Sequence, residues 1–408
     1  MPSTIGTGRP ATTWRSFFTR PLGRHRLAPQ RNTLSAAAAG GAVDRAARTA
    51  LWRRAARVAA VAAVAAVAVV AMLAIDWRGT RPSRPLPAPG LLEVQGHCTE
   101  TAARAEDATR LLVNAEAGHT ICVTGDSLRD TDLALHASGT AARPISVVAD
   151  GTLVHSVTVT GDNIVVEGFT VEGGAGIVLA GNGLVARHNV VRDATDDGIS
   201  CSRPCSNAEI SDNTVVRADG SGIDVEGQRI LVRANLISDS KKIHSADADG
   251  IRFFGSDIVI EGNRIADITD AGYVRDAPHT DCFQTFDNSG QPTVRVTISG
   301  NICRNVDHQC LIATAEEAGR AELIGRSRDI TFTGNMCDVN GSQAVLVRWV
   351  PHVRVVSNYL IGPNLDRAAI FLDGSTDAEY VNNTVPTGVL PYEIDENSRP
   401  GFNSGPHG

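Results

Sequence analysis

Eight asparagines recur in the same local setting along the C-terminal part of this chain. Each has an apolar residue three places before it and another two places after it, as Ile260 and Ile265 flank Asn263. Successive copies are 22 to 38 residues apart, the range in which one repeat forms a unit that buries its apolar face only against neighbouring copies. The chain is therefore predicted to be a stack of repeats. The asparagines are Asn189, Asn213, Asn235, Asn263, Asn301, Asn335, Asn358 and Asn383.

Within each repeat, apolar residues alternate with polar ones over short runs that are rich in β-branched side chains. The stretch from Ser256 to Ile265 is one example. A period of two predicts strands, because a helix would show a period near 3.6. Parallel strands wound into coils fit this pattern. We expect each asparagine amide to bond to the asparagines above and below it at the strand spacing of about 4.8 Å.

The segment that leads into the repeats strengthens this interpretation. Residues 102–114 have helical apolar spacing, and residues 118–125 and 138–149 contain short strand patterns. On these residues and the asparagine repeat, the chain from about Leu91 to its end resembles a right-handed parallel β-helix of the pectin-lyase-like superfamily. The resemblance implies an all-β solenoid with an N-terminal capping helix, because an uncovered coil would expose strand edges and apolar side chains.

The N-terminal quarter has a different composition. Residues 1–57 contain eleven arginines and the single acid Asp44, and Val58–Ile75 is an uncharged apolar run long enough to span a bilayer. We expect residues 1–54 to be a disordered, arginine-rich cytoplasmic tail, 55–76 a single transmembrane helix, 77–90 a proline-rich spacer, and 91–408 the β-helix domain. The positive-inside rule predicts a single-pass protein of the cell membrane with its C-terminal domain extracytoplasmic. The alternative is a cleaved signal peptide and a secreted protein.

The charge of the remaining chain excludes one class of partner. Residues 1–76 hold eleven of the 38 Lys and Arg residues and two of the 45 Asp and Glu residues, so 27 basic and 43 acidic residues remain, a formal charge near −16. A surface of this charge repels nucleic acid. We therefore expect no nucleic-acid partner. We also expect a monomer that contacts the membrane only through its N-terminal helix.

Eight cysteines in an exported chain predict disulfides. One pair shares a short loop, and two pairs occupy equivalent positions on adjacent coils, where stacking brings their Cα atoms within disulfide range. For these stacked pairs the alternative is reduced cysteines in the core. No spacing of Cys and His indicates zinc. The predicted pairs are Cys98–Cys122, Cys201–Cys205, Cys282–Cys310 and Cys303–Cys337.

Chemistry is expected where the coils are irregular. The longest intervals surround Asn263, Asn301 and Asn335, so long loops leave consecutive coils at one level, and loops on a rigid scaffold commonly carry function. Aligned by repeat position, polar residues there form rows. The rows intersect at a segment that resembles His-x-Asp-x-x-Gln segments of uncharacterised β-helix proteins. The cluster comprises Asp247, Asp249, Arg252, His279, Asp281, Gln284 and Asp307.

These residue types support acid and base chemistry. Carboxylates one strand spacing apart raise each other's proton affinity, and a histidine held by Asp247 or Asp307 serves as a general base near neutral pH. An arginine neutralises a sugar carboxylate. The predicted catalytic residues are His279, Asp281, Asp249, Arg252 and Lys242, and the predicted substrate-binding residues are Gln284, Asp224, Arg275 and Lys241.

A metal and two lysines complete the predicted site. Asp247, Asp249 and Asp281 predict a Ca²⁺ site, because Ca²⁺ prefers oxygen ligands. Lys241 and Lys242 are the only lysines in the chain and lie in a loop before the cluster. Certain β-helix polysaccharide lyases use Lys as the base, with Arg and often Ca²⁺. A structural interpretation stays open for each group, because Asp before Gly is an ordinary turn residue and a lysine pair also suits a solvated loop.

These observations predict an extracytoplasmic carbohydrate-active protein that binds polysaccharide. We expect an enzyme, similar to the polysaccharide lyases, that cleaves or modifies a uronic-acid-containing polymer by β-elimination or epimerisation. Glycoside hydrolysis is the weaker assignment, since the downstream Arg-x-Lys common in hydrolases of this fold is absent from the sequence. The alternative is a noncatalytic surface protein that binds glycan or serves as a structural stalk.

Overall fold

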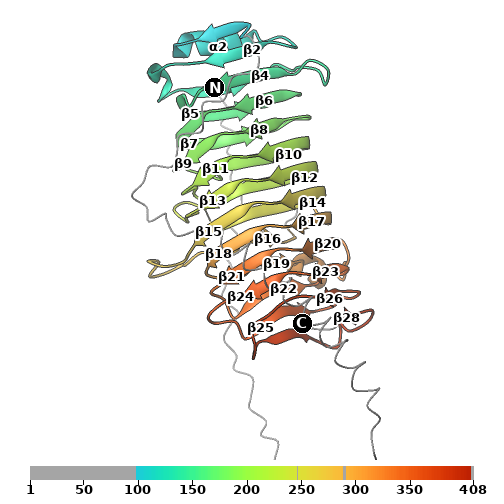
Figure 1. The fold of residues 1–408 in the computed structure, drawn as a ribbon. Helices are drawn as coiled ribbons and strands as arrows, with labels where there is room; N and C mark the ends of the chain where they lie inside the picture. Colours follow the sequence, from blue (N-terminus) through green and yellow to red (C-terminus); the bar gives the residue numbers. More distant parts are fainter. Residues whose placement is uncertain (1–97, 246, 288–290, 406–408) are drawn as a thin grey trace, which may run out of the picture. The chain divides into compact units, whose positions relative to one another are not determined.

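A computed structural model describes residues 98–245, 247–287 and 291–405. These residues wind into a parallel β-helix, and every pairing between its named strands is parallel (Figure 1). The all-β prediction is confirmed for this part of the chain. The predicted cytoplasmic tail, transmembrane helix and spacer lie outside the described residues. Within the described residues, no helix is both long and apolar enough to cross a membrane.

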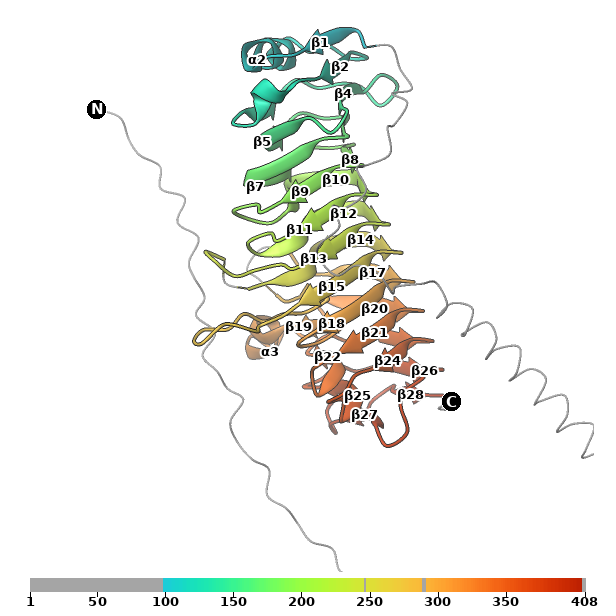
Figure 2. The same ribbon diagram turned by 60° about the vertical axis from the view of Figure 1, so that its left-hand side comes forward.

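Three series of stacked strands form the faces of the solenoid (Figures 1 and 2). The first, here called the site face, contains β3 (Asp132–Leu135), β5 (Leu153–Val159), β7 (Thr170–Leu179), β10 (Ile199–Ser211), β12 (Ser221–Arg233), β14 (Asp249–Glu261), β16 (Phe283–Thr285), β19 (Leu311–Thr314), β22 (Gln343–Arg348), β25 (Arg367–Leu372) and β27 (Leu390–Ile394).

The second face contains β1 (Glu100–Ala102), β2 (Thr120–Val123), β4 (Ile145–Ala149), β6 (Ile164–Glu167), β8 (Val185–Arg187), the C-terminal parts of β10, β12 and β14, then β17 (Val294–Ser299), β20 (Arg328–Thr333), β23 (Val353–Val356), β26 (Glu379–Val381) and β28 (Asn403–Ser404). The third face contains β9 (Val190–Arg192), β11 (Thr214–Val216), β13 (Leu236–Ser238), β15 (Arg264–Ile268), β18 (Ile302–Val306), β21 (Met336–Val339) and β24 (Tyr359–Ile361).

The predicted asparagine row lies at the turn between the second and third faces, and it is confirmed. Each of the eight asparagines is at most 1% exposed. The side-chain amide of Asn263 donates to Val232 O and to Asn301 Oδ1, both at 3.0 Å. Its own Oδ1 accepts from the backbone and side-chain nitrogens of Asn235 at 3.0 and 2.9 Å. The coils from Asn189 to Asn383 are thereby bonded to one another through buried polar groups that would otherwise lack partners.

The first coils are closed by a helix, as predicted. In α2 (Ala105–Val113) the side chains of Ala108, Leu111 and Leu112 are buried in the apolar interior. Figure 1 shows α2 at the N-terminal end of the stack. A short 3₁₀ helix, Asp126–Leu128, follows β2. The helix covers apolar side chains that the open end of a coil would leave in water.

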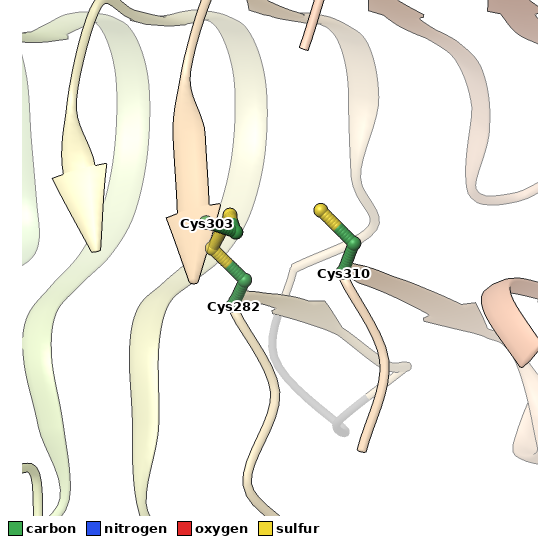
Figure 3. Close-up of side chains that lie close together, drawn as sticks. All are labelled: Cys282, Cys303 and Cys310. Atoms are coloured by element: carbon green, nitrogen blue, oxygen red, sulfur yellow. A yellow bond between two sulfur atoms is a disulfide. The ribbon is translucent and has the colours of Figure 1, made fainter. Parts of the chain in front are cut away.

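The described residues contain four disulfides, and two of them differ from the predicted pairing. The pair in the short loop and the pair near α2 form as predicted. The predictions Cys282–Cys310 and Cys303–Cys337 are wrong. Figure 3 shows Cys282 bonded to Cys303, with Cys310 beside them. The observed pairs are Cys98–Cys122, Cys201–Cys205, Cys282–Cys303 and Cys310–Cys337.

The two interior disulfides each join two positions of one coil, because these positions face each other across the interior. In the preceding coil a Cβ on Gly250 would lie 2.6 Å from Ile265 Cγ2, and these two positions align with Cys282 and Cys303 on the next coil. Glycine opposite a branched residue fills the space in earlier coils, and two cysteines fill it here. In the sequence both positions become Cys in the same repeat, but the repeat pattern alone does not show that they face each other.

Replacing Asn263 by alanine is expected to lower the free energy of unfolding by about 2–4 kcal/mol, because buried donors and acceptors on both neighbouring coils lose their partners. Chemical denaturation followed by circular dichroism measures this loss. The exposed Asn364, whose amide bonds only to Asn340 O, is the control, and Asn364→Ala should change stability by less than about 1 kcal/mol. Equal effects in both variants would contradict the importance of the buried row.

Proteolysis without reduction, followed by mass spectrometry, is expected to yield peptides that link Cys282 to Cys303 and Cys310 to Cys337. A reduced digest is the control, in which these linked masses disappear. Peptides that instead join Cys282 to Cys310 would show that the bonds run between coils.

Candidate functional site

The loops between the third face and the site face lengthen before β14 and β16. They cover residues 239–248 and 269–282, and a further loop after β19 contains α3 (Glu316–Arg320). Figure 2 shows α3 beside β19 on one side of the solenoid. The C-terminal ends of these loops and the strands that follow carry most of the predicted site residues.

A chain of hydrogen bonds joins four predicted residues across β14 and β16. Arg252 Nη2 donates to Asp249 Oδ2 at 2.6 Å, and Arg252 Nε donates to Gln284 Oε1 at 3.0 Å. Gln284 Nε2 donates to Asp247 Oδ2 at 3.2 Å, which also lies 3.9 Å from Arg252 Nη2. Arg252 and Gln284 are cross-strand partners, so their side chains meet on the outward surface of the site face.

His279 and Asp281 form a second charged pair, with 3.2 Å between Nδ1 and Oδ2. Asp281 Oδ1 accepts the Gln309 N–H at 2.7 Å, and the Asp281 N–H donates to Asp249 Oδ1 at 3.1 Å. Asp281 thus fixes the ring with Nδ1 inward and leaves Nε2 for other contacts. The expected partners of His279 were Asp247 and Asp307; Asp281 takes this place because residues two apart in an extended segment point to the same side.

Exposure separates the residues that a substrate can touch from those that hold them. The side chains of His279, Arg252 and Asp247 are 42%, 18% and 17% exposed, whereas Asp249 and Asp281 are fully buried. Each buried carboxylate therefore neutralises and orients one cation above it. His279, Arg252 and Asp247 are the groups that face solvent.

Burial and neighbouring charges shift the proton affinities of the cluster. Burial raises the pKa of Asp247 above its ordinary value, against the charges of Arg252 and His279. Burial, reinforced by Asp247, raises the pKa of Asp249 well above its ordinary value. The hydrogen bond to Asp281 raises the pKa of His279 to about 9, so its ring is charged at neutral pH. An imidazolium beside a carboxyl group with increased proton affinity is an arrangement suited to acid–base catalysis.

Arg252 is held as a cation by several acids. Burial opposes its charge, but Asp249, Asp197 and Asp224 outweigh burial and keep the pKa of Arg252 above its ordinary value. The predicted substrate-binding residue Asp224 is the register partner of Arg252 on the preceding coil and is 7% exposed. Phe286, which the sequence analysis did not single out, lies with its ring centre 5.9 Å from Arg252 Cζ.

A row of side chains just before the site-face strands bonds one coil to the next. Asp197 accepts the Ser221 N–H at 2.7 Å, as Asp249 accepts from Asp281 and Asp281 from Gln309. The side chain of Asp197 therefore serves to bond one coil to the next. Asp249 and Asp281 also accept a backbone N–H from the next coil, and each forms an ion pair in addition, Asp249 with Arg252 and Asp281 with His279.

Two other acids of the rows organise the loops. Asp219 accepts the backbone N–H groups of Ile243 and His244, both at 2.7 Å. Asp307 accepts the Asp270 N–H at 2.9 Å. These carboxylates hold the loops before β14 and β16 in place, which is why Asp307 is not the partner of His279.

The predicted lysines lie apart from the cluster. Lys242 Nζ donates to Asp276 O at 2.7 Å, and the Lys242 N–H donates to Tyr273 Oη at 2.8 Å, so Lys242 ties the two loops together. Arg275 is exposed in the second loop. Among the described residues, no hydrogen bond or ion pair links Lys241, Lys242 or Arg275 to the cluster.

His308 belongs to the cluster but was missed by the sequence analysis. Its Nδ1 accepts the Thr280 N–H at 3.1 Å, and its ring centre lies 4.8 Å from that of His279. The available signal was its place directly after Asp307 in the aligned rows. The rows were aligned with the two-residue period of a strand, so they included Asp307 and omitted the adjacent His308.

Two of the three predicted Ca²⁺ ligands already hold hydrogen bonds within the protein through both carboxylate oxygens. All four carboxylate oxygens of Asp249 and Asp281 already accept hydrogen bonds from backbone or cationic groups. His279, Asp281 and His308 place possible ligand atoms within 4.8 Å of one another, but Nδ1 of both histidines is engaged. No step proposed below uses a metal, and Ca²⁺ stays an untested prediction.

A family model described as a right-handed β-helix region matches residues 146–242 and 175–385. The two matches together cover more than half of the chain. The chain belongs to this family. The predicted right-handed parallel β-helix is thereby confirmed. No curated protein matches the chain in sequence.

Several solved structures are similar to part of this chain. An alginate lyase from Paenibacillus sp. str. FPU-7 is 17% identical, with 73% of this chain and 100% of that chain covered and a TM-score of 0.43. The catalytic unit of an α-1,3-glucanase from Streptomyces thermodiastaticus is 14% identical, with coverages of 78% and 69% and a TM-score of 0.44. A tailspike protein of E. coli bacteriophage HK620, in complex with a pentasaccharide, is 12% identical, with coverages of 74% and 62% and a TM-score of 0.49.

Replacing Asp281 by asparagine is expected to lower the pKa of His279 from about 9 toward its ordinary 6.5, because the neutral amide removes the charge that favours the imidazolium. Asparagine still offers an oxygen to the Gln309 N–H. NMR titration of the histidine C–H signals measures the shift.

The exposed Asp257, which pairs with Arg295, supplies the control, and Asp257→Asn should leave the pKa of His279 unchanged. The raised value also sets the sign of the pH dependence. The stability from this pair is fully present below pH 6.5 and is lost as the pH rises through about 9. An unchanged pKa in Asp281→Asn would contradict the pairing.

Proposed function

We propose that this protein is a carbohydrate-active enzyme that cleaves a uronic-acid-containing polysaccharide by β-elimination. One observation carries the proposal: Asp247, an accessible carboxyl group with a raised pKa, lies beside two solvent-facing cations, Arg252 and His279, each held by a fully buried carboxylate. The arrangement offers a base, a group that neutralises a sugar carboxylate, and a proton donor.

The reaction follows from these three groups. The Asp247 carboxylate takes the proton from C5 of the uronic acid, and the C–H electron pair forms the double bond between C4 and C5. The bond from C4 to the glycosidic oxygen breaks, and His279 Nε2–H protonates the departing oxygen. Arg252 stabilises the negative charge that develops on the C6 carboxylate. Asp281 and Asp249 are positioning residues.

The raised pKa values suit these roles. A carboxylate with increased proton affinity is a stronger base than an ordinary Asp, and His279 still carries its proton at neutral pH. Activity should therefore depend on pH as a bell-shaped curve. It rises as Asp247 loses its proton and falls as His279 loses its proton near pH 9.

The proposed location is outside the cytoplasm, with residues 55–76 as the membrane anchor. Polysaccharide is found there, and the four disulfides of the described residues suit an oxidising compartment. The proposal of catalysis rests on the site and not on the solved structures compared above. The residues after position 76, with a formal charge near −16, repel an anionic polymer, so salt that screens this repulsion should assist binding.

Wild-type protein incubated with polyuronates at moderate ionic strength is expected to release products that carry a C4–C5 double bond, detected by their ultraviolet absorption. Replacing Asp247 by asparagine should lower kcat by about a hundredfold or more, because the amide cannot accept the C5 proton. Activity across a pH series, together with circular dichroism of the variant, separates loss of chemistry from loss of folding.

Lys242→Met is the matched control and should keep wild-type kcat, since Lys242 contacts the neighbouring loop. A large loss in Lys242→Met with a normal Asp247→Asn would overturn the assignment of the base. New reducing ends without unsaturated products would indicate hydrolysis. Binding without any product would indicate a noncatalytic glycan-binding protein.

A further inference from the structure

His308 is fixed by two reciprocal hydrogen bonds to the preceding coil. Its Nδ1 accepts the Thr280 N–H at 3.1 Å, and its own backbone N–H donates to Thr280 O at 3.0 Å. Thr280 lies between the two residues of the His279–Asp281 pair. The position of the His308 ring is therefore coupled to the site without any bond to a catalytic side chain.

The bond from Thr280 also determines which ring nitrogen of His308 carries the proton. A backbone N–H needs a lone pair on Nδ1, so the neutral ring carries its hydrogen on Nε2. Among the described residues, none accepts a hydrogen bond from His308 Nε2. The ring is partly exposed. His308 therefore presents one N–H donor that the protein itself does not use.

The order of side chains along the solenoid indicates which part of the substrate lies near the Nε2–H of His308. Asp247, His279 and His308 come from three successive coils, which rise by about 4.8 Å each, and the ring centres of the two histidines are 4.8 Å apart. In the proposed elimination, Asp247 faces C5 of the uronic acid and His279 faces the departing oxygen. A polymer that runs along the solenoid axis then places the departing sugar over His308.

We propose that His308 binds the departing sugar, with its Nε2–H donating to an oxygen of that residue. This inference rests on the proposed function and makes His308 a substrate-binding residue for the sugar on the far side of the cleaved bond. A hydroxyl oxygen of the departing sugar can accept this hydrogen bond.

Two conservative variants separate the two nitrogens of His308. His308→Asn keeps an oxygen near the place of Nδ1 for the Thr280 N–H and removes the outer donor, whereas His308→Gln keeps a donor near the place of Nε2. Each is assayed as the full-length chain with two substrates: a uronic-acid disaccharide, whose leaving group is a sugar, and a uronoside that carries a phenol at C4.

His308→Asn is expected to lower kcat/KM about tenfold for the disaccharide and to leave the phenol substrate unchanged. His308→Gln should have the wild-type kcat/KM with both substrates. In both variants the loss of activity near pH 9 should occur at the same pH as in the wild type. Equal losses with both substrates would show a merely structural role for His308. A loss in His308→Gln equal to that in His308→Asn would exclude the outer donor.

A binding measurement tests the sugar contact of His308 independently of the proposed elimination reaction. If the wild type turns over neither substrate, the elimination is wrong, and calorimetric titration with the same two compounds still tests His308. A preference of the wild type for the disaccharide that disappears only in His308→Asn supports the sugar contact. The same preference in all three proteins would overturn it.

Discussion

The hydrogen bonding of buried asparagines from coil to coil is the constraint on which the rest of this structure depends. Asn263 accepts two hydrogen bonds from Asn235 through its side-chain oxygen, and it donates two to Asn301 from its backbone and side-chain nitrogens. A slip of one residue would bury unpaired amides and turn apolar side chains outward. The register is therefore rigid, and equivalent residues of successive coils lie in straight rows. The candidate site is an intersection of such rows.

The rigid register holds the charged side chains of the site in fixed positions. Asp249 and Asp281 are fully buried, yet each has a backbone donor and one cation, so neither is an uncompensated charge. Arg252 and His279 are thus held at the surface in defined orientations beside Asp247. The hydrogen bond to Asp281 raises the pKa of His279, and burial raises the pKa of Asp247. For His279, orientation and proton affinity have one physical origin.

The sequence predicted most of the fold and much of the membership of the cluster. Strand periodicity and the asparagine repeat suffice for a parallel solenoid, because both follow from spacing along the chain. The aligned rows identified His279, Asp281, Asp249, Asp247, Arg252 and Gln284 for the same reason. Three details were not predicted: Asp281 as the partner of His279, the inclusion of His308, and the separation of Lys242 from the cluster. The place of His308 directly after Asp307 was visible in the aligned rows. The other two details depend on the path of a loop, which no repeat determines.

The disulfides show which features the sequence determined and which only the tertiary structure decided. By itself the sequence determined which residues share a repeat position, since the register of stacked strands follows from a regular pattern of apolar and polar residues. Only the tertiary structure decided which positions face each other inside one coil, where Cys282 meets Cys303 and Gly250 meets Ile265. Periodicity along the chain specifies neighbours between coils. Contacts across the interior of a coil depend on the angles at its turns, and those angles are set by packing of the whole cross-section.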